Sequence, residues 1–363
     1  MAREVQIALG DRSYPIWIGS GVSNRLSEAL RGLRGLVVTD AHVDACHGAK
    51  IMERLGAAWG KIVLPPGEGT KSAAQWADLL ERLAAAKLDR QAVLAALGGG
   101  VVGDLTGFAA ASYMRGIRFV QIPTSLLAMV DSSVGGKTGI NLAAGKNLAG
   151  AFHQPLAVFA DTDLLATLPA REFAAGLAEV VKYGVALDAD FFAWLESNAA
   201  AILARDSAAL EQMVARCCEI KADVVARDER EGGLRAVLNF GHTLGHAIEK
   251  ATGYGGVLHG EAVALGMPFA LAWSIEAKGF DPKDAGRVVF LLAKFGLNIA
   301  ALKPKNLDWR VLRDAMGRDK KSQDGAVRFV LCDRLGHCGL PEPIPAADLD
   351  ELLKGWCRDV GGQ

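Results

Sequence analysis

A glycine-rich hexapeptide follows a short apolar run in the first half of this chain. Residues 92–97 are apolar, and the next six read Gly98-Gly99-Gly100-Val101-Val102-Gly103. Between a strand and a helix, this pattern lets the backbone approach a pyrophosphate at the helix N-terminus, where exposed N–H groups favour anions. A plain glycine-rich turn is the alternative. Because no acidic residue follows some 20 positions later, Asp40 at the end of an earlier apolar run is the candidate acid for ribose binding.

Other short apolar runs precede and follow this glycine loop. They alternate with helical patterns such as 73–87, and they occupy residues 36–38, 61–64, 92–97, 118–122 and 156–160. Alternation of this kind favours βαβ units and a mostly parallel sheet. Residues 5–9 and 14–18 alternate around Gly10-Asp11-Arg12-Ser13 and predict an opening hairpin.

The composition and periodicity of the sequence change after Pro169. Ala, Leu, Glu and Arg then recur at helical spacing, which predicts helices over 173–183, 190–205, 208–227, 243–250, 261–277 and 288–295. We therefore predict an α/β protein with a Rossmann-like nucleotide-binding domain over residues 1–168. A mainly α-helical metal- and substrate-binding domain is predicted over 169–363.

Composition excludes several classes of protein. The 363 residues carry 40 Lys plus Arg against 41 Asp plus Glu, for a formal charge of −1, which argues against a nucleic-acid partner. The apolar run 262–275 is shorter than the ~20 residues that span a bilayer, and no signal-peptide pattern opens the sequence. The six cysteines form no C-x-x-C pair, so reduced thiols are expected. A soluble, cytoplasmic protein without membrane partner is the expectation.

Two lysines lie in a second glycine-rich segment. Lys137 and Lys146 stand among Gly135, Gly136, Gly139 and Gly145. The run from Asp131 to Thr138 has Asp where a Walker A loop needs Gly, so a P-loop is excluded. Two cations on glycine-rich backbone suit a phosphate or another anionic ligand, and a solvated loop is the alternative.

Three histidines suggest a metal site. His242 and His246 are spaced i, i+4 at the head of a helical pattern, and His259 begins the next one. With a carboxylate from elsewhere, for which Glu179 is the candidate, they would make a zinc-type site. Helix capping or core packing is the alternative for the histidines, and a surface ion pair with Lys182 is the alternative for Glu179.

Four segments together resemble the 3-dehydroquinate synthase family of sugar-phosphate cyclases. They are Gly98–Asp104, Pro123–Asn141, Ala178–Gly184 and Asn239–Ala247. Their order and spacing match along nearly the whole chain. The resemblance implies a lyase that converts 3-deoxy-D-arabino-heptulosonate 7-phosphate into 3-dehydroquinate and phosphate, with NAD and a divalent metal (Zn²⁺ or Co²⁺) as cofactors. The steps implied are transient oxidation, phosphate elimination, reduction and aldol closure, within the shikimate pathway to chorismate and the aromatic amino acids.

The resemblance also implies roles for individual residues. The metal ligands would be Glu179, His242 and His259, which leaves His246 on the substrate side. The NAD-binding set would be Asp40, Glu68, Lys71, Gly99, Gly100, Val101, Val102, Gly103, Asp104, Thr124, Ser125, Lys137, Lys146, Thr162, Leu164, Leu165 and Thr167. Substrate contacts would come from Asp131, Lys137, Lys146, Asn147, Lys182, Lys221, Arg235, Asn239, His246, His259 and Lys320. Among them, Lys137, Lys182, Arg235, Asn239 and His246 would be catalytic.

The family pattern implies a homodimer in which Arg115 enters the site of the partner subunit. One departure occurs at His42, where asparagine is expected, and it affects only the detail of ribose recognition. Three rival functions stay open at this point. They are another sugar-phosphate cyclase, a metal-dependent polyol dehydrogenase that releases NADH, and a binding module without catalysis.

Overall fold

The protein is described by a computed structural model that covers residues 3–253, 256–305, 307–317 and 326–358. Its chain forms two compact units. Unit 1 comprises residues 1–169 and 205–230, and unit 2 comprises residues 170–204 and 231–363. The two units are described separately below.

Unit 1 is built on a seven-stranded sheet in the order β1-β2-β9-β6-β5-β3-β4. The strands are β1 (Arg3–Ile7), β2 (Tyr14–Gly19), β3 (Gly35–Asp40), β4 (Trp59–Leu64), β5 (Val93–Gly98), β6 (Arg118–Pro123) and β9 (Val158–Asp161). The β1–β2 pair is the predicted antiparallel hairpin, and every other neighbouring pair is parallel. The α/β fold class and the five predicted parallel strands are therefore confirmed.

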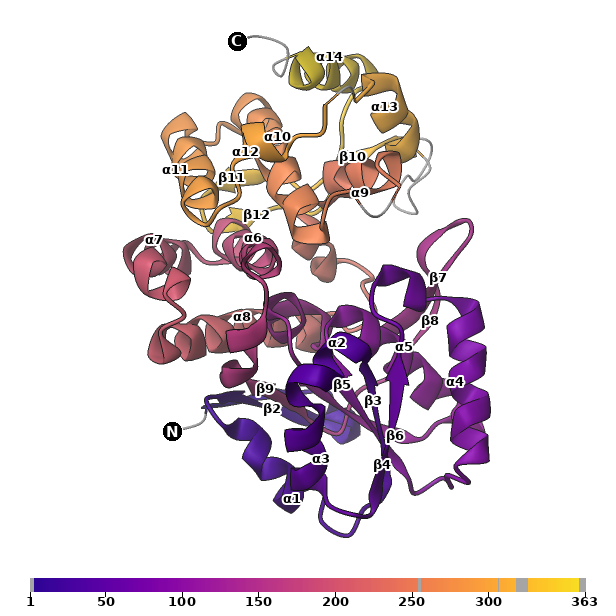
Figure 1. The fold of residues 1–363 in the computed structure, drawn as a ribbon. Helices are drawn as coiled ribbons and strands as arrows, with labels where there is room; N and C mark the ends of the chain where they lie inside the picture. Colours follow the sequence, from indigo (N-terminus) through magenta and orange to yellow (C-terminus); the bar gives the residue numbers. More distant parts are fainter. Residues whose placement is uncertain (1–2, 254–255, 306, 318–325, 359–363) are drawn as a thin grey trace. The chain divides into compact units, whose positions relative to one another are not determined.

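Helices cover both faces of this sheet (Figure 1). They are α1 (Leu26–Ala29), α2 (Ala41–Val43), α3 (Ala49–Leu55), α4 (Ala73–Ala85), α5 (Gly100–Ser112) and α8 (Ser207–Arg227). Leu36 and Val38 alternate along β3 and pack in one core with Leu79 of α4 and Leu105 of α5. Apolar residues at every second position of the strand share one face of the sheet, and apolar residues at helical spacing share one face of the helix. These two faces pack together in the core.

The strand order creates a switch point between β3 and β5. From β3 the chain crosses to β4 on one side, and then returns to β5 on the other side of β3. In open α/β sheets, ligands bind outside the carboxyl ends of the strands where the winding direction reverses. Asp40 ends β3 and Gly98 ends β5, so the two sequence features assigned to the nucleotide lie at this point.

The second glycine-rich segment forms a separate hairpin of β7 (Lys137–Leu142) and β8 (Gly145–Phe152). These strands are not predicted from the sequence. A Cβ on Gly150 would stand 2.1 Å from the carbonyl oxygen of Thr138, so glycine is needed for the close approach of the two backbones. Glycines that suggest a loop in the sequence lie in paired strands in the structure.

Helix α8 lies apart in sequence from the rest of unit 1 but packs against β1, β2 and the short helix η6 (Ala128–Ser132). Its Cys218 thiol donates to the carbonyl oxygen of Met129 at 3.4 Å. The change in composition after Pro169 predicts that residues 208–227 belong to the second domain. An amphipathic pattern shows which face of a helix is buried but not which partner buries it, and the structure assigns this helix to unit 1.

Unit 2 is mainly helical. Its helices are α6 (Ala170–Leu187), α7 (Ala189–Leu203), α9 (His242–Ala251), α10 (His259–Lys278), α11 (Pro282–Lys294), α12 (Ile299–Leu302), α13 (Trp309–Gly317) and α14 (Ala346–Arg358). Short strands complete it: β10 (Arg328–Phe329), β11 (Cys332–Arg334), β12 (His337–Cys338) and β13 (Glu342–Pro343). Cys332 and Cys338 are joined by a disulfide, so the expectation of reduced thiols is wrong for this pair. The two cysteines lie opposite each other in the β11–β12 pair, which their sequence spacing did not reveal.

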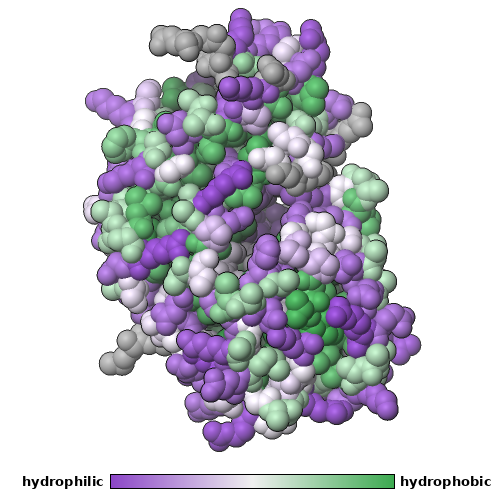
Figure 2. Space-filling view, viewed as in Figure 1, coloured by the Kyte–Doolittle hydropathy of each residue, from purple (hydrophilic) through white to green (hydrophobic). Residues whose placement is uncertain are grey.

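Hydrophilic and hydrophobic residues are intermixed on the face shown in Figure 2. Among the described residues, no helix combines the length and the apolar character needed to cross a bilayer. The run 262–275 lies inside α10 and is largely buried, as its composition predicted.

Candidate metal centre and nucleotide site

Three helices of unit 2 bring one carboxylate and two imidazoles together. Glu179 lies in α6, and His242 and His259 are the first residues of α9 and α10. Two glycines allow this approach. A Cβ on Gly260 would stand 1.8 Å from the carbonyl oxygen of Ala175, and one on Gly266 would stand 1.9 Å from that of Gly241. The helix backbones therefore pack closely enough for short side chains to meet.

The spacing of the donor atoms fits a metal ion. Glu179 Oε1 lies 3.3 Å from Nε2 of His242 and 3.3 Å from Nε2 of His259. Ligands at zinc distances of about 2.0–2.1 Å in tetrahedral array stand about 3.3 Å apart. Within the described residues, buried Glu179 Oε1 has no hydrogen-bond partner. A buried carboxylate oxygen without a donor is costly unless a cation binds it, and one carboxylate with two imidazoles suits Zn²⁺ or Co²⁺.

The electrostatics of the cluster favour an ionised carboxylate. Burial raises the pKa of Glu179, but the Lys182 ammonium and the imidazoles lower it more, and the net pKa lies well below its usual value. Burial lowers the pKa of His242 to about 4, against the opposing effect of Glu179. Burial also lowers the pKa of His259, but the adjacent carboxylates of Glu179 and Glu249 raise it to about 10. The cluster thus offers one anionic ligand and, at His242, one neutral imidazole.

Four further predicted residues lie in the described part of unit 2. Lys182 is 1% exposed and forms an ion pair with Glu179 Oε2. The His246 ring lies 5.4 Å from that of His242 and 6.0 Å from that of His259. Arg235 and Asn239 lie in η8 (Leu234–Asn239), where the side-chain amide of Asn239 donates to Glu231 Oε1 at 3.1 Å. The structure therefore gathers Lys182 and His246 around the candidate metal ligands.

In unit 1, the predicted nucleotide residues lie at the carboxyl ends of the strands. Helix α5 begins at Gly100 directly after β5, and the Thr124 amide, after β6, donates to the Gly98 carbonyl at 3.0 Å. A Cβ on Gly99 would stand 3.3 Å from Ser125 Oγ, so a larger residue would crowd this turn. Asp40 Oδ1 accepts hydrogen bonds from the amides of His42 and Val43, at 2.9 and 3.1 Å.

The short helix η7 (Thr162–Thr167) follows β9 at the same edge of the sheet. Within the described residues, the buried Thr162 Oγ1 has no hydrogen-bond partner. Thr167 Oγ1 lies 2.8 Å from His47 Nε2. The side chains of Leu164 and Leu165 are buried, so only their backbone is suited to a polar cofactor.

A network of ion pairs and amides joins predicted cofactor and substrate residues. Lys71 forms an ion pair with Asp104 and donates to Asn147 Oδ1 at 2.5 Å. Lys146 lies 3.9 Å from Glu68, which also accepts a hydrogen bond from Asn141 Nδ2 at 2.7 Å. Burial raises the pKa of Asp104, and Lys71 opposes that rise. The cations of this network are thus balanced by acids of the same unit.

Two further predicted lysines belong to unit 1, one in α8 and one at the start of β7. Lys221 of α8 donates to Asp131 Oδ1 at 2.6 Å, and Lys137 is the exposed first residue of β7. Arg115 ends the short helix η5 (Tyr113–Arg115); it is exposed, with φ of +67°. Lys320 lies outside the described residues.

Sequence reasoning missed two residues that take part in these contacts. Glu249 contacts His259, and Glu231 contacts Asn239. The signal for Glu249 was available, because it follows His242 and His246 at helical spacing on one face of α9. No comparable spacing signal marked Glu231.

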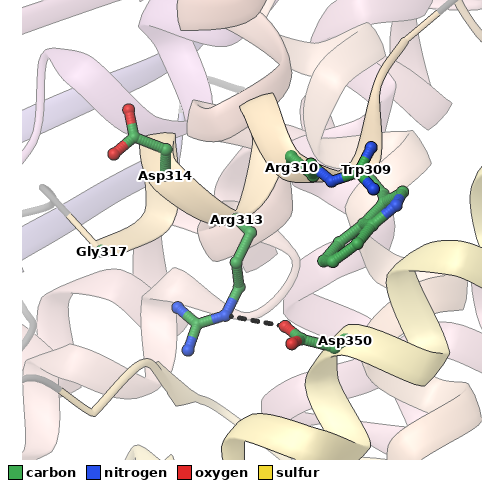
Figure 3. A pocket seen from close by; sticks show the side chains of 6 residues that line it. All are labelled: Trp309, Arg310, Arg313, Asp314, Gly317 and Asp350. Carbon is green, nitrogen blue, oxygen red and sulfur yellow. Dashed lines mark hydrogen bonds and ion pairs between the residues drawn. The ribbon is translucent and has the colours of Figure 1, made fainter.

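A surface hollow of about 580 Å³ lies elsewhere in unit 2 (Figure 3). It is lined by Trp309, Arg310, Arg313, Asp314, Gly317 and Asp350. Arg313 Nε donates to Asp350 Oδ1 at 3.1 Å across it. None of its lining residues belongs to the candidate metal cluster, so the hollow plays no part in the assignment of function.

Comparisons with known proteins agree with the geometry of both units. Residues 61–175 match the family model described as 3-dehydroquinate synthase N-terminal, and residues 176–322 match the one described as 3-dehydroquinate synthase C-terminal. A 3-dehydroquinate synthase from Rhodospirillum rubrum is 53% identical over 345 residues, which is 91% of this chain and 89% of that protein.

Two solved structures are similar over nearly the whole chain. One is 2-deoxy-scyllo-inosose synthase complexed with carbaglucose-6-phosphate, NAD⁺ and Co²⁺, with a TM-score of 0.88, 28% identity and coverage of 97% of this chain and 100% of that one. The other is 2-epi-5-epi-valiolone synthase from Streptomyces hygroscopicus subsp. jinggangensis with NAD⁺ and Zn²⁺ bound. Its TM-score is 0.88 at 26% identity, with coverage of 97% of this chain and 99% of that one.

Proposed function

This chain belongs to the 3-dehydroquinate synthase family, and from that premise we propose which of its residues carry out the reaction. The enzyme is a carbon–oxygen lyase of the shikimate pathway that forms 3-dehydroquinate and phosphate from 3-deoxy-D-arabino-heptulosonate 7-phosphate, with NAD and a divalent metal as cofactors. The observation that carries the residue assignment is the buried cluster of Glu179 with two imidazole nitrogens, each 3.3 Å from its Oε1.

Glu179, His242 and His259 are the proposed metal ligands. Three protein ligands leave coordination positions open, as in catalytic zinc sites. A bound divalent metal would act as a Lewis acid that lowers the pKa of a substrate hydroxyl. Lys182 adds a positive charge beside the carboxylate, and His246, beside both imidazoles, is suited to exchange a proton with the substrate.

The proposed NAD site is the strand edge of unit 1. The N-terminus of α5 at Gly99, Gly100, Val101, Val102 and Gly103 would face the pyrophosphate, and Asp40 at the switch point would contact the ribose. Thr124, Ser125, Thr162 and Thr167 would add hydroxyl groups, while Glu68, Lys71 and Asp104 would complete the charged rim. NAD bound there would supply the oxidation of a substrate alcohol to a ketone, with hydride leaving the carbon that carries the hydroxyl and a proton leaving the oxygen. The ketone would make a neighbouring C–H acidic.

The substrate carries a phosphate and a carboxylate, so its site needs fixed cations. We assign this task to Lys137, Lys146, Lys182, Lys221, Arg235 and Lys320, with Asp131, Asn147 and Asn239 as polar partners. The support for Lys221 and Lys146 is that each already contacts an acid, Asp131 and Glu68 respectively, and is thereby held in place. A negatively charged ligand would compete with Asp131 and Glu68 for these two lysines.

A homodimer in which Arg115 acts in the partner's site is also proposed. Met114 and Arg115 are both exposed, and both have left-handed backbone angles (φ +49° and +67°). Such angles cost free energy in residues other than glycine and concentrate at functional positions. Leu148 and Phe152, both exposed on β8, add apolar surface suited to association. We also propose that the enzyme acts in the cytoplasm.

Complementation tests the shared site. Arg115→Ala and Lys182→Ala chains should each be inactive alone, and mixing them should restore activity because a mixed dimer holds one intact site. Native mass spectrometry would verify that mixed dimers form. Mixed dimers without any recovered activity would contradict an arginine supplied by the partner.

The direct test of function is phosphate release from the heptulosonate phosphate, with NAD and Zn²⁺ or Co²⁺ present. We expect phosphate to appear without accumulation of NADH, since the hydride returns to the substrate within each turnover. Stoichiometric NADH would favour a polyol dehydrogenase instead. Turnover of glucose 6-phosphate in place of the heptulosonate phosphate would favour another sugar-phosphate cyclase.

A further inference from the structure

Glu249 is a buried acid beside the candidate metal cluster, and it has no role in the assignments above. It lies in α9, where His242, His246 and Glu249 follow one another at i, i+4 and i+7 and therefore share a helix face. Glu249 is only 3% exposed. A carboxylate this deeply buried requires a partner that compensates its charge.

One such partner is the imidazole of His259. Glu249 Oε2 lies 3.2 Å from His259 Nδ1, and the Nε2 atom of the same ring lies 3.3 Å from Glu179. When Nδ1–H donates to a carboxylate, the lone pair on Nε2 is left to face the metal. The hydrogen bond also fixes the plane of the ring. Glu249 thus contacts His259 on the side opposite to the metal position.

The second imidazole is held by a different acceptor. His242 Nδ1 lies 3.1 Å from the backbone carbonyl oxygen of Phe240. Both rings therefore present Nε2 to Glu179. On the other side of the ring, Nδ1 of His242 contacts a neutral carbonyl oxygen, whereas Nδ1 of His259 contacts a carboxylate. A carboxylate increases the basicity of the imidazole that donates to it more than a carbonyl does, so the two histidines are unequal ligands.

We propose that Glu249 is a positioning residue that orients His259 and strengthens it as a metal ligand. This inference rests on the proposed metal site of Glu179, His242 and His259. It differs from a purely structural role such as that of Glu261, another buried acid of unit 2, whose carboxylate binds Arg171 and the Leu258 amide and contacts no ring nitrogen in the described part of the chain.

A competing arrangement is a second cation site. Ligand atoms of His246, Glu249 and His259 lie within 4.8 Å of one another. In that case Nδ1 of His259 would face a cation and would carry no proton for Glu249. The two arrangements differ in metal stoichiometry, because positioning predicts one zinc per chain and a second site predicts two.

The experiment compares Glu249→Ala and Glu249→Gln with the unchanged full-length chain. Glu196→Gln is the control, since Glu196 is a carboxylate of the same unit that pairs with Arg287 outside the cluster. Zinc affinity would be measured by competition with a chromophoric chelator, zinc stoichiometry by titration, and ligand geometry from the visible spectrum of the Co²⁺ form. The Tm of the metal-free proteins would report on folding independently of the metal.

Glu249→Ala should weaken zinc binding about 10–100-fold and alter the Co²⁺ spectrum, as loss of an outer carboxylate does. Glu249→Gln retains an acceptor oxygen without the charge, so its loss should be smaller. The Glu249→Gln variant also keeps the test valid if the Glu249→Ala protein does not fold. Glu196→Gln should match the unchanged chain in affinity and spectrum, with one zinc per chain throughout.

Unchanged zinc affinity and Co²⁺ spectrum in both Glu249 variants would overturn the inference, as would two zinc ions per chain. A lower Tm alone, with zinc affinity intact, would show a purely structural role and would also overturn it. His242→Ala separates this failure from that of the proposed metal site. If His242→Ala abolishes zinc binding while the Glu249 variants bind normally, only the positioning role fails. If His242→Ala binds zinc normally, the site itself is wrong and both proposals fail.

Discussion

The metal cluster of unit 2 and the strand edge of unit 1 are built by different means. Glu179, His242 and His259 converge because glycine contacts bring three helices close together. At the strand edge, Lys71 pairs with Asp104, and Lys221 pairs with Asp131. The first site is preorganised by packing, whereas the second holds its charges by mutual pairing. We therefore expect substitutions of the metal ligands to abolish nearly all activity. Substitutions at the strand edge should instead weaken ligand binding by a moderate factor.

The largest expected effect is that of His242→Ala. Lewis-acid stabilisation by a metal is worth several kcal/mol, so its loss should lower kcat/KM by about 10³-fold or more. The Tm of the metal-free protein should change little. Steady-state phosphate release and thermal unfolding would measure the two quantities. Full activity in metal-stripped, unchanged protein would remove the basis of this prediction.

A substitution that breaks the packing without touching a ligand comes next. In Gly266→Ala, the added Cβ would stand 1.9 Å from the Gly241 carbonyl oxygen, so the backbones of α9 and α10 must move apart. We expect a loss of about 1–3 kcal/mol in stability or more, together with weaker zinc binding. Urea unfolding and zinc competition would measure both.

Gly286→Ala in α11 is the matched control, since its Cβ would meet nothing within 4 Å. Removing an interior helix glycine without a clash should stabilise the protein by about 0.5–1 kcal/mol. If Gly266→Ala behaved like Gly286→Ala, close packing would not be what assembles the cluster.

At the strand edge, Lys71→Met should weaken NAD binding about 10–100-fold, because a charge-assisted hydrogen bond is lost and Asp104 stays uncompensated. Zinc affinity should not change. Isothermal titration would measure both constants. Arg82→Met, which removes an exposed ion pair with Asp78, is the control and should leave NAD affinity as it is. An equal loss in both variants would argue against a specific role for Lys71.

The smallest expected effect concerns α8, the helix that returns to unit 1. Burial raises the pKa of the Cys218 thiol to about 12, so this thiol stays protonated and unreactive at pH 8. The exposed Cys46 should be alkylated by a maleimide under the same conditions. Peptide mapping would locate the label, and rapid labelling of Cys218 in folded protein would argue against the packing of α8 on η6.

Much of this arrangement could be predicted from the sequence. The five parallel strands followed from short apolar runs, and the position of the glycine loop between β5 and α5 followed from its neighbours. Local patterns of this kind determine which element forms. Family resemblance was needed to choose Glu179, His242 and His259 over the simpler pairing of His242 with His246, since helical spacing does not show which imidazole faces a carboxylate from another helix.

Other features depend on tertiary contacts that no local pattern encodes. The β7–β8 hairpin was missed because Gly139 and Gly150 suggest a loop until their backbones are seen to pair. The disulfide joins cysteines whose proximity is created by the β11–β12 pair. Helical spacing places Glu249 on the histidine face of α9, but its contact with His259 depends on where α10 places that ring.

The central claim is that Glu179, His242 and His259 hold the metal. A crystal structure of the zinc-loaded protein, with anomalous data collected at the zinc edge, tests it most directly. We predict one strong peak about 2.0–2.2 Å from a Glu179 carboxylate oxygen and from Nε2 of both histidines. A peak bound instead by His246, Glu249 and Nδ1 of His259, or no peak at either cluster, would contradict the claim.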